Sequence, residues 1–412
     1  MKGPVMKLLM TQFRQSKLMP IGGLPCCLLM VAALPPAARA QNQAAPDLLV
    51  QAHQIVVAID TVLTDGKLLV RQGKVAYVGN DIPAEARARA TVVDYGQAVI
   101  VPGFVLATST LGQERDLAEM SLAFTPDLLA SEAFDPWQEE LEPLAKNGIT
   151  ALALSPSARN VAGGIAALVK PGRERGTVVA PELFLSLSLA QSARNPERQP
   201  TSLMGAMDLL HTAFAAVRTG TKAGPDAAIL NQVMQGSRRV FVHADTYTEL
   251  SGALDLAKEF GFEPVLIGAR DAEKVLPRLV RQKASVVLST LAPEDRLQQL
   301  RLPVRLAEAG VPFCFAGRPD QLRLSAALAV RHGLDRKTAL QSLTRVPATL
   351  LDQQSAIGSL RQGNAGDFAV YSGDPLDFDS THLATWIDGV LVHGALPVAN
   401  RVTAPANLLG DR

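Results

Sequence analysis

Residues 99–112 read Val-Ile-Val-Pro-Gly-Phe-Val-Leu-Ala-Thr-Ser-Thr-Leu-Gly, and this stretch separates two kinds of sequence pattern. Two apolar runs flank the break at Pro102-Gly103, because proline and glycine interrupt regular structure. Before the break the pattern is typical of short strands, whereas after it strands and helices alternate to about residue 350. The chain therefore combines a β-rich segment with an α/β segment.

Apolar strands separated by helices dominate the second segment. An amphipathic helix is expected over 248–261, with Gly261 at its C-terminal stop. Near-continuous apolar strands indicate a parallel sheet covered on both faces. This length and rhythm favour a closed (β/α)₈ TIM-like barrel; an open doubly wound sheet is the alternative, although no G-x-G-x-x-G follows a strand. The expected strands are 148–155, 238–244, 263–269, 284–290 and 311–317.

Both ends of the chain carry strand patterns. At the N-terminal end, Asp65-Gly66 and Gln72-Gly73 are predicted hairpin turns, and 91–100 is a further strand. At the other end, strands are expected at 368–373 and over 385–394, with a turn at Asp388-Gly389. We expect the two ends to pair in one small β-domain.

The N-terminus has the pattern of an export signal. Positive residues precede an apolar run from Leu24 to Leu34, and Ala38-Arg39-Ala40 predicts cleavage before Gln41. We therefore expect a periplasmic or secreted protein without a membrane anchor after cleavage; an uncleaved anchor is the alternative. Cys314 would be the one cysteine left, so the mature chain could form no internal disulfide.

Charge excludes one class of partner. The 412 residues include 40 Lys and Arg against 39 Asp and Glu, a net charge of +1. Such a balance gives no basic surface for nucleic acid. The aromatic content of 5% also provides few stacking platforms.

Several motifs resemble the amidohydrolase superfamily, and most closely its imidazolonepropionase-like members. Residues 60–79, DTVLTDGKLLVRQGKVAYVG, resemble the opening hairpin of the family, and 335–376 are similar to its C-terminal stretch, with Pro347-Ala348 and Gly373-Asp374-Pro375-Leu376. The resemblance implies a TIM-like barrel with a composite β-sandwich built from both termini. It divides the chain into a signal peptide (1–40), an N-terminal sandwich segment (47–100), the barrel (101–352) and a C-terminal sandwich segment (353–405).

The resemblance also identifies where the family holds a catalytic divalent metal such as zinc. Its first barrel strand carries Asp-x-His-x-His, where this chain has Leu106, Thr108 and Thr110. His243 matches the metal-ligand histidine of the fifth strand. The remaining family positions fall at Gln191 or a neighbour on strand four, Gly268 on strand six and Gly317-Arg318 on strand eight.

Those substitutions remove metal-binding chemistry. A threonine hydroxyl is a poor ligand, glycine has no side chain, and arginine is a permanent cation without an acceptor. We therefore expect no metal, no other cofactor and no catalytic residue. His243, Arg318, Thr108 and Thr110 remain candidates for binding a small molecule at the barrel mouth. As alternatives, His243 is a core histidine and Arg318 pairs with Asp320.

Three functions are open at this point. The first is an exported amidohydrolase-fold protein that has lost metal-dependent catalysis and binds a ligand, or acts as a non-catalytic subunit beside an active paralogue. The second is an active hydrolase of cyclic amides or dipeptide-like substrates with an altered site, using His243 as base and Arg318 as electrostatic stabiliser. The third is a purely structural or interaction protein.

Overall fold

The computed structural model describes residues 47–58 and 60–397. The expected export signal over 1–40 and its cleavage position lie outside these residues. Among the helices of the described ranges, none has the length and apolar character needed to cross a bilayer.

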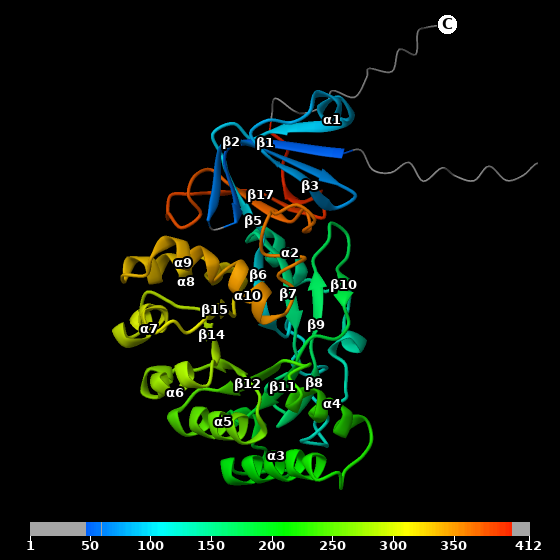
Figure 1. Ribbon diagram of the computed structural model, residues 1–412, viewed down its shortest axis with the longest axis vertical. Helices are drawn as coiled ribbons and strands as arrows, with labels where there is room; N and C mark the ends of the chain where they lie inside the picture. The colour runs from blue at the N-terminus through cyan, green and yellow to red at the C-terminus, as the bar shows by residue number, and fades with distance from the viewer. Residues whose placement is uncertain (1–46, 59, 398–412) are drawn as a thin grey trace, which may run out of the picture. The chain divides into compact units, whose positions relative to one another are not determined.

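One eight-stranded sheet, here called the terminal sheet, combines strands from both ends of the chain (Figure 1). β5 and β16 pair antiparallel, with Val101 opposite Ala369, so the two ends meet as the sequence predicted. The sheet encloses a core of its own, in which Phe368 stacks on Trp386. Its order is β18-β17-β16-β5-β1-β2-β3, with β4 beside β1. The strands are β1 (Asp47–Ala58), β2 (Thr61–Arg71), β3 (Lys74–Gly79), β4 (Ala90–Asp94), β5 (Val99–Pro102), β16 (Phe368–Tyr371), β17 (His382–Ile387) and β18 (Val390–Gly394), and helix α1 (Ala84–Arg89) precedes β4.

The turns of this sheet follow the sequence in two places and depart from it in a third. Gln72-Gly73 and Asp388-Gly389 have positive φ at both residues and close hairpins, as predicted. The prediction of a turn at Asp65-Gly66 is wrong, because Gly66 lies inside β2 opposite Ala52 of β1. Asp65 takes a φ of +51° within the strand, and the apolar residues beyond it continue the pairing.

The barrel segment contains seven parallel strands in two sheets. One sheet has the order β10-β9-β7-β6 and the other β15-β14-β13-β12-β11-β8, and β15 lies next to β6 without a hydrogen-bonded ladder between them. The mixed α/β fold class with a TIM-like barrel is therefore confirmed. The parallel strands are β6 (Phe104–Ser109), β7 (Ile149–Leu154), β11 (Leu185–Ser188), β12 (Val240–Ala244), β13 (Pro264–Gly268), β14 (Ser285–Ser289) and β15 (Phe313–Ala316).

Helices connect most of these strands and cover the outside of the barrel (Figure 1). Gly261 ends α5 in a left-handed conformation, with a φ of +78°, as its position in the sequence predicted. The helices are α2 (Leu141–Lys146), α3 (Leu203–Arg218), α4 (Pro225–Met234), α5 (Tyr247–Phe260), α6 (Leu276–Arg281), α7 (Leu297–Glu308), α8 (Pro319–Arg331), α9 (Arg336–Gln341) and α10 (Arg345–Leu350). Short 3₁₀ helices are η1 (Ala130–Ala133), η2 (Gln191–Ala193) and η3 (Ala272–Val275).

Three antiparallel strands were not anticipated from the sequence. β8 (Ala162–Ile165) pairs with β11, and β9 (Ala167–Lys170) pairs with β7 and with β10 (Thr177–Ala180). They lie between β7 and β11 in the chain, where a simple βα repeat would put another parallel strand. Their runs are only four residues long, which is too short for a clear periodic signal.

An ion cluster with two buried members, Lys170 and Asp367, and one exposed member, Asp388, joins the barrel to the terminal sheet. Lys170, at the end of β9, has its Nζ 2.8 Å from Asp367 Oδ2 and 2.7 Å from Asp388 Oδ1. Burial opposes the charge of Lys170, but the two carboxylates outweigh it and raise its pKa. Burial raises the pKa of Asp367 to about 6, against the attraction of Lys170. We call these three residues the junction cluster.

Candidate functional site

The carboxyl ends of several parallel strands surround a cavity of about 450 Å³, here called the mouth cavity. In (β/α)₈ barrels this end of the strands carries the functional groups, because the loops that follow the strands are free to vary. Apolar residues of β13 and β14 form much of the wall. The cavity is lined by residues 108–112, 114, 140, 144, 267, 287–289 and 316–319.

Thr108 and Thr110 both line the mouth cavity and are half-buried. Thr108, near the end of β6, donates its hydroxyl hydrogen to Ser155 Oγ at 3.0 Å. Thr110 donates to Glu114 Oε1 at 2.8 Å. Each hydroxyl donor is thus engaged by a neighbouring side chain, and each oxygen still has acceptor capacity for a ligand.

Arg318 lines the mouth cavity and is the residue that immediately precedes α8. Its Nη2 lies 2.7 Å from Asp320 Oδ2 and its Nε lies 3.2 Å from Asp320 Oδ1. The side chain is 68% exposed. Of the two alternatives that the sequence left open, the pairing with Asp320 is the one present. An exposed pair of this kind contributes little to stability.

His243 lies on β12, level with Ser188 of β11 and Ile267 of β13. Its Nε2 is covered and has no hydrogen-bond partner among the described residues. Burial lowers the pKa of His243 to about 4, so the imidazole is neutral at pH 7. His243 is not among the residues that line the mouth cavity. The structure therefore brings Thr108, Thr110 and Arg318 together and leaves His243 apart from them.

Glycines end the two strands at the remaining family positions. Gly268 has a φ of +90°, and a Cβ there would lie 3.2 Å from Asp245 Oδ1. Gly317 has a φ of +144°, and a Cβ there would lie 3.0 Å from Thr290 Oγ1. An L-residue side chain is strained in these conformations whatever the space around it. The backbone at both strand ends is thus arranged for glycine.

The donor set does not fit a metal centre. A divalent ion of the zinc type needs imidazole, carboxylate or thiolate donors, three or more from the protein. His243 Nε2 is a suitable donor, but the other family positions hold Thr108, Thr110, Gly268 and the Arg318 cation. Over residues 47–58 and 60–397 there is no group of three His, Cys, Asp or Glu placed to hold a metal.

The position expected on strand four shifts in the structure. Gln191 lies in η2, beyond the end of β11, and its side chain is exposed. The residue level with His243 is Ser188, which is buried. The sequence did not show where β11 ends, because this strand has only four residues and a 3₁₀ turn follows it.

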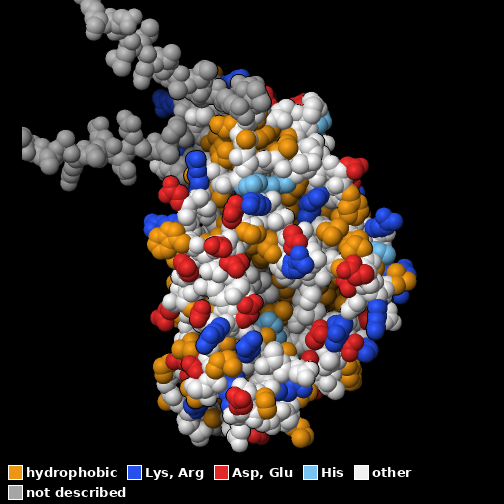
Figure 2. Space-filling model, turned by 180° about the vertical axis from the view of Figure 1, so that it is seen from behind, with side chains coloured by type: hydrophobic (Ala, Val, Ile, Leu, Met, Phe, Trp, Pro, Cys, Tyr) orange, Lys and Arg blue, Asp and Glu red, His pale blue; other side chains and the backbone are white. Residues whose placement is uncertain are grey.

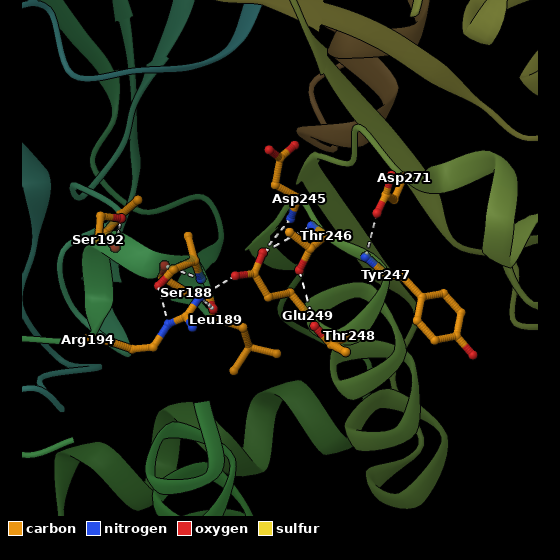
Figure 3. Close-up of polar contacts among 12 residues, drawn as sticks. Ser188, Leu189, Ser192, Arg194, Asp245, Thr246, Tyr247, Thr248, Glu249 and Asp271 are labelled. Atoms are coloured by element: carbon orange, nitrogen blue, oxygen red, sulfur yellow. Dashed lines mark hydrogen bonds and ion pairs between the residues drawn. The ribbon is translucent and has the colours of Figure 1, made fainter. Parts of the chain in front are cut away.

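A polar network that sequence reasoning missed holds the loops after β11 and β12 (Figure 3). Glu249 is 4% exposed, and its Oε2 accepts hydrogen bonds from the backbone N–H groups of Asp245 and Thr246 at 3.0 and 3.1 Å. Its Oε1 pairs with Arg194, whose guanidinium also donates to the carbonyl of Leu189. The Thr-x-x-Glu capping box was readable in sequence. The partnership with Arg194 was not, because it lies 55 residues away.

Two carboxylates also line the mouth cavity without having been predicted. Glu114 accepts from Thr110, and Glu140 Oε2 accepts from Gln138 Nε2 at 2.6 Å. The cavity therefore offers apolar walls, hydroxyl groups, two carboxylates and one paired guanidinium. This set can bind a small polar molecule by hydrogen bonds.

Two further features limit the chemistry. Cys314 is fully buried in β15, and burial raises the pKa of its thiol, as expected for a small core residue.

On the face drawn in Figure 2, acidic and basic side chains are intermingled, and neither sign forms a continuous patch.

Comparison with known proteins finds related chains of the same fold. A family model described as "Amidohydrolase family" matches residues 320–393. The amidohydrolase tasK of Hapsidospora irregularis is 22% identical over 389 residues, which cover 79% of this chain but only 39% of that relative.

Solved structures resemble the chain over most of its length. An amidohydrolase from Thermotoga maritima MSB8 has a TM-score of 0.75 and 23% identity, covering 84% of this chain and 100% of that one. A prolidase complexed with N-methylphosphonate-L-proline has a TM-score of 0.53 and 15% identity, covering 85% of this chain and 100% of that one. At these identities the structural likeness shows the fold.

Proposed function

Because the chain belongs to the amidohydrolase superfamily, we propose that it is an exported member that lacks metal-dependent catalysis and binds a small molecule at the barrel mouth. The superfamily placement puts it with hydrolases of non-peptide C–N bonds. The ligand contacts in this proposal are Thr108, Thr110 and Arg318, which line the mouth cavity; His243, the fourth residue suggested by the sequence, does not line it. No metal or other cofactor takes part.

The single observation that carries the proposal is the donor set at the strand ends. Four positions where the family binds metal hold Thr108, Thr110, Gly268 and Arg318, and two strands end in glycines with positive φ. Without a Lewis acid, a bound water keeps its ordinary pKa and a substrate carbonyl is not polarised. The hydroxyls and apolar walls of the mouth cavity still suit binding.

Elemental analysis of the purified chain tests this proposal. The protein is stripped with a chelator, incubated separately with zinc, iron and manganese, and desalted before measurement. We expect only traces of metal after each loading. A stoichiometric metal ion that is lost on His243→Ala substitution would overturn the proposal, because it would place the ion in the barrel.

An active hydrolase with an altered site is the second candidate. The observation that favours it is the neutral His243 imidazole, whose Nε2 is unpartnered and able to accept a proton. Against it, Arg318 is bound to Asp320 and lines a cavity that His243 does not. Turnover of cyclic amides or N-acyl amino acids that survives a chelator and is lost in His243→Ala would support this candidate.

Export and a protein partner complete the proposal. The positive N-terminal residues, the apolar run and Ala38-Arg39-Ala40 support a periplasmic or secreted location. A non-catalytic subunit beside an active paralogue is the alternative to a ligand-binding role, and the net charge of +1 favours a partner other than nucleic acid. Cell fractionation tests the location, and co-purification from the native source tests the subunit role.

A further inference from the structure

A second cavity, here called the α3 cavity, lies between the loop after β6, the loop that precedes α3, and α3 itself. Its volume is about 780 Å³, and it is lined by residues 121–124, 198–202, 205, 208, 209 and 212. None of these residues lines the mouth cavity. The α3 cavity is therefore a separate place, outside the function proposed above.

Apolar side chains form some of its wall. Leu122 is 58% exposed, and Phe124, Pro200 and Leu209 lie around it in the lining. Lys222 Nζ lies 4.7 Å from the ring centroid of Phe124, so one side of that ring is already covered by a cation. An exposed leucine among other apolar lining residues is surface that a ligand with an apolar body would bury.

Arg198 provides an unpaired cation in the same lining. Its Nη2 donates to the carbonyl of Arg159 at 2.7 Å, whereas its Nε and Nη1 are covered and have no hydrogen-bond partner among the described residues. Glu119 attracts this cation, but its Oε1 accepts from both the backbone N–H and the hydroxyl of Ser121. Burial lowers the pKa of Arg198, with Glu119 opposing the shift.

Those two N–H groups matter because unmet hydrogen bonds are costly. A covered donor without a partner destabilises the protein, and a carboxylate is the partner that matches the fork of a guanidinium. Both N–H groups belong to a side chain that lines the α3 cavity. A ligand carboxylate would then satisfy donors that the chain itself leaves unmet.

Asp208 provides the opposite charge. It lies on α3, it is exposed, and it makes no hydrogen bond or ion pair with any other described residue. One apolar cavity is thus lined by a guanidinium with two unmet donors and by a carboxylate without a partner. This combination is complementary to a molecule that carries both charges.

We propose that the α3 cavity binds a small zwitterion with an apolar body, namely an aliphatic α-amino acid or a short peptide of such residues. The ligand carboxylate meets Arg198, its ammonium group meets Asp208, and its side chain covers Leu122. The volume admits either source of this chemistry, so the test includes both.

Calorimetric titration of the mature chain tests the proposal with four probes. These are L-leucine, the dipeptide Leu-Leu, L-leucinamide, which lacks the carboxylate, and 4-methylpentanoate, which lacks the amine. We expect L-leucine or Leu-Leu to bind at least about tenfold more tightly than either single-charge analogue, since each lost charged hydrogen bond costs about 1.5–3 kcal/mol. The tighter of the two zwitterions identifies the source.

Matched variants assign each charge. In Arg198→Gln the advantage of leucine over leucinamide should disappear, and in Asp208→Asn its advantage over 4-methylpentanoate should disappear. Arg281→Gln and Asp127→Asn change exposed side chains outside the lining and should leave both preferences intact. Arg318→Gln at the mouth cavity should also leave leucine affinity unchanged, which separates this inference from the proposed function.

Absence of saturable binding of both zwitterions into the millimolar range would overturn the proposal. So would equal preferences in the wild-type chain and in Asp208→Asn, a substitution at an exposed helix position for which circular dichroism checks that the fold is kept. The Asp208→Asn result decides the matter even where Arg198→Gln does not fold.

Discussion

The junction cluster and the mouth cavity treat charge in opposite ways. At the junction, Lys170 and Asp367 are 6% and 4% exposed and lie within 2.8 Å of each other. At the mouth, Arg318 and Asp320 have side chains 68% and 55% exposed and pair within two residues of sequence. The ion pair at the mouth cavity is therefore exposed, whereas the Lys170–Asp367 pair at the junction is buried.

The two ion pairs differ in how much they contribute to the stability of the folded chain. A buried pair joins Lys170 of the barrel to Asp367 beside the terminal sheet. Removing one partner of such a pair leaves a buried charge without compensation and destabilises the fold. An exposed pair such as Arg318–Asp320 exchanges readily with water. This chain has an internal ionic connection between barrel and sheet, and its mouth cavity offers hydroxyls and glycines. Four experiments test this contrast.

The largest effect is expected at the junction cluster. Lys170→Met should lower the free energy of unfolding by about 3–5 kcal/mol, because it leaves two carboxylates near each other without their shared cation. Urea unfolding at pH 7 measures the change. The matched control is Lys146→Met, which breaks the exposed pair with Glu142 and should cost about 0.5 kcal/mol. Equal losses in the two variants would erase the contrast between buried and exposed pairs.

A second contact between the barrel and the terminal sheet, at His382, should make the free energy of unfolding depend on pH. Its ring nitrogen Nε2 lies 2.8 Å from Thr385 Oγ1, which donates to the carbonyl of Ala145 in α2. Burial, and then the nearby His393, lower the pKa of His382 to about 4. The unfolded chain therefore binds this proton more readily, at a pKa of about 6.5. Its stabilising contribution is present above pH 6.5 and is lost as the pH falls towards 4.

The size of this loss is roughly 1–3 kcal/mol after allowance for partial exposure. Urea unfolding of the wild-type chain and of His382→Gln at several pH values between 7 and 4 gives the difference in slope, and the variant should be less sensitive to acid. His53→Gln alters a surface histidine paired with Asp65 and should keep the wild-type slope. Parallel curves for wild type and His382→Gln would refute the assignment.

At the mouth cavity, we expect the backbone conformation to oppose the reintroduction of the family's metal ligands. Gly268→His should destabilise the chain by about 1–3 kcal/mol, because histidine must adopt a φ of +90° there. Thr108→His adds the same side chain at a position without positive φ and should cost less. Unfolding in urea compares the two variants.

The combined variant Thr108→His, Thr110→His, Gly268→His and Arg318→Asp extends this test. If only side chains had been lost, it would bind zinc stoichiometrically; we expect it to bind little, because the ends of β13 and β15 are arranged for glycine. Elemental analysis after zinc loading distinguishes the two. Tight stoichiometric binding would show that the mouth keeps its metal-binding geometry.

The smallest effect is expected for the mouth ion pair. Arg318→Gln should change the free energy of unfolding by about 0.5 kcal/mol or less, since the pair with Asp320 is exposed. The same denaturation assay measures it, with Asp320→Asn as the reciprocal variant. A loss of several kcal/mol would mean that Arg318 has a structural role comparable to that of Lys170.

Local signals in the sequence predicted much of the fold. Gly261 marked the end of α5, Gln72-Gly73 and Asp388-Gly389 marked two hairpins, and the apolar runs located five barrel strands. These features depend on neighbours within a few residues, so the order of residues contains them. Asp65-Gly66 misled because the same dipeptide is tolerated inside a strand when long pairing continues on both sides.

Long-range partners were beyond such reasoning. Arg194 and Glu249 are 55 residues apart, and Lys170 and Asp388 are 218 apart, so no local pattern connects them. The short strands β8 to β10 were equally hidden, because four residues give no clear period.

By itself, the sequence determined which chemical groups stand at the family's metal positions: Thr108, Thr110, Gly268, Arg318 and a single remaining histidine, His243. Threonine is a poor metal ligand, glycine has no side chain and arginine has no acceptor, so the expectation of no metal at these positions needed no coordinates. Only the tertiary structure decided that Thr108, Thr110 and Arg318 share a cavity while His243 does not, and that Gly268 has a positive φ. Those facts depend on how distant strands pack and where each backbone turns, which residue order alone does not specify.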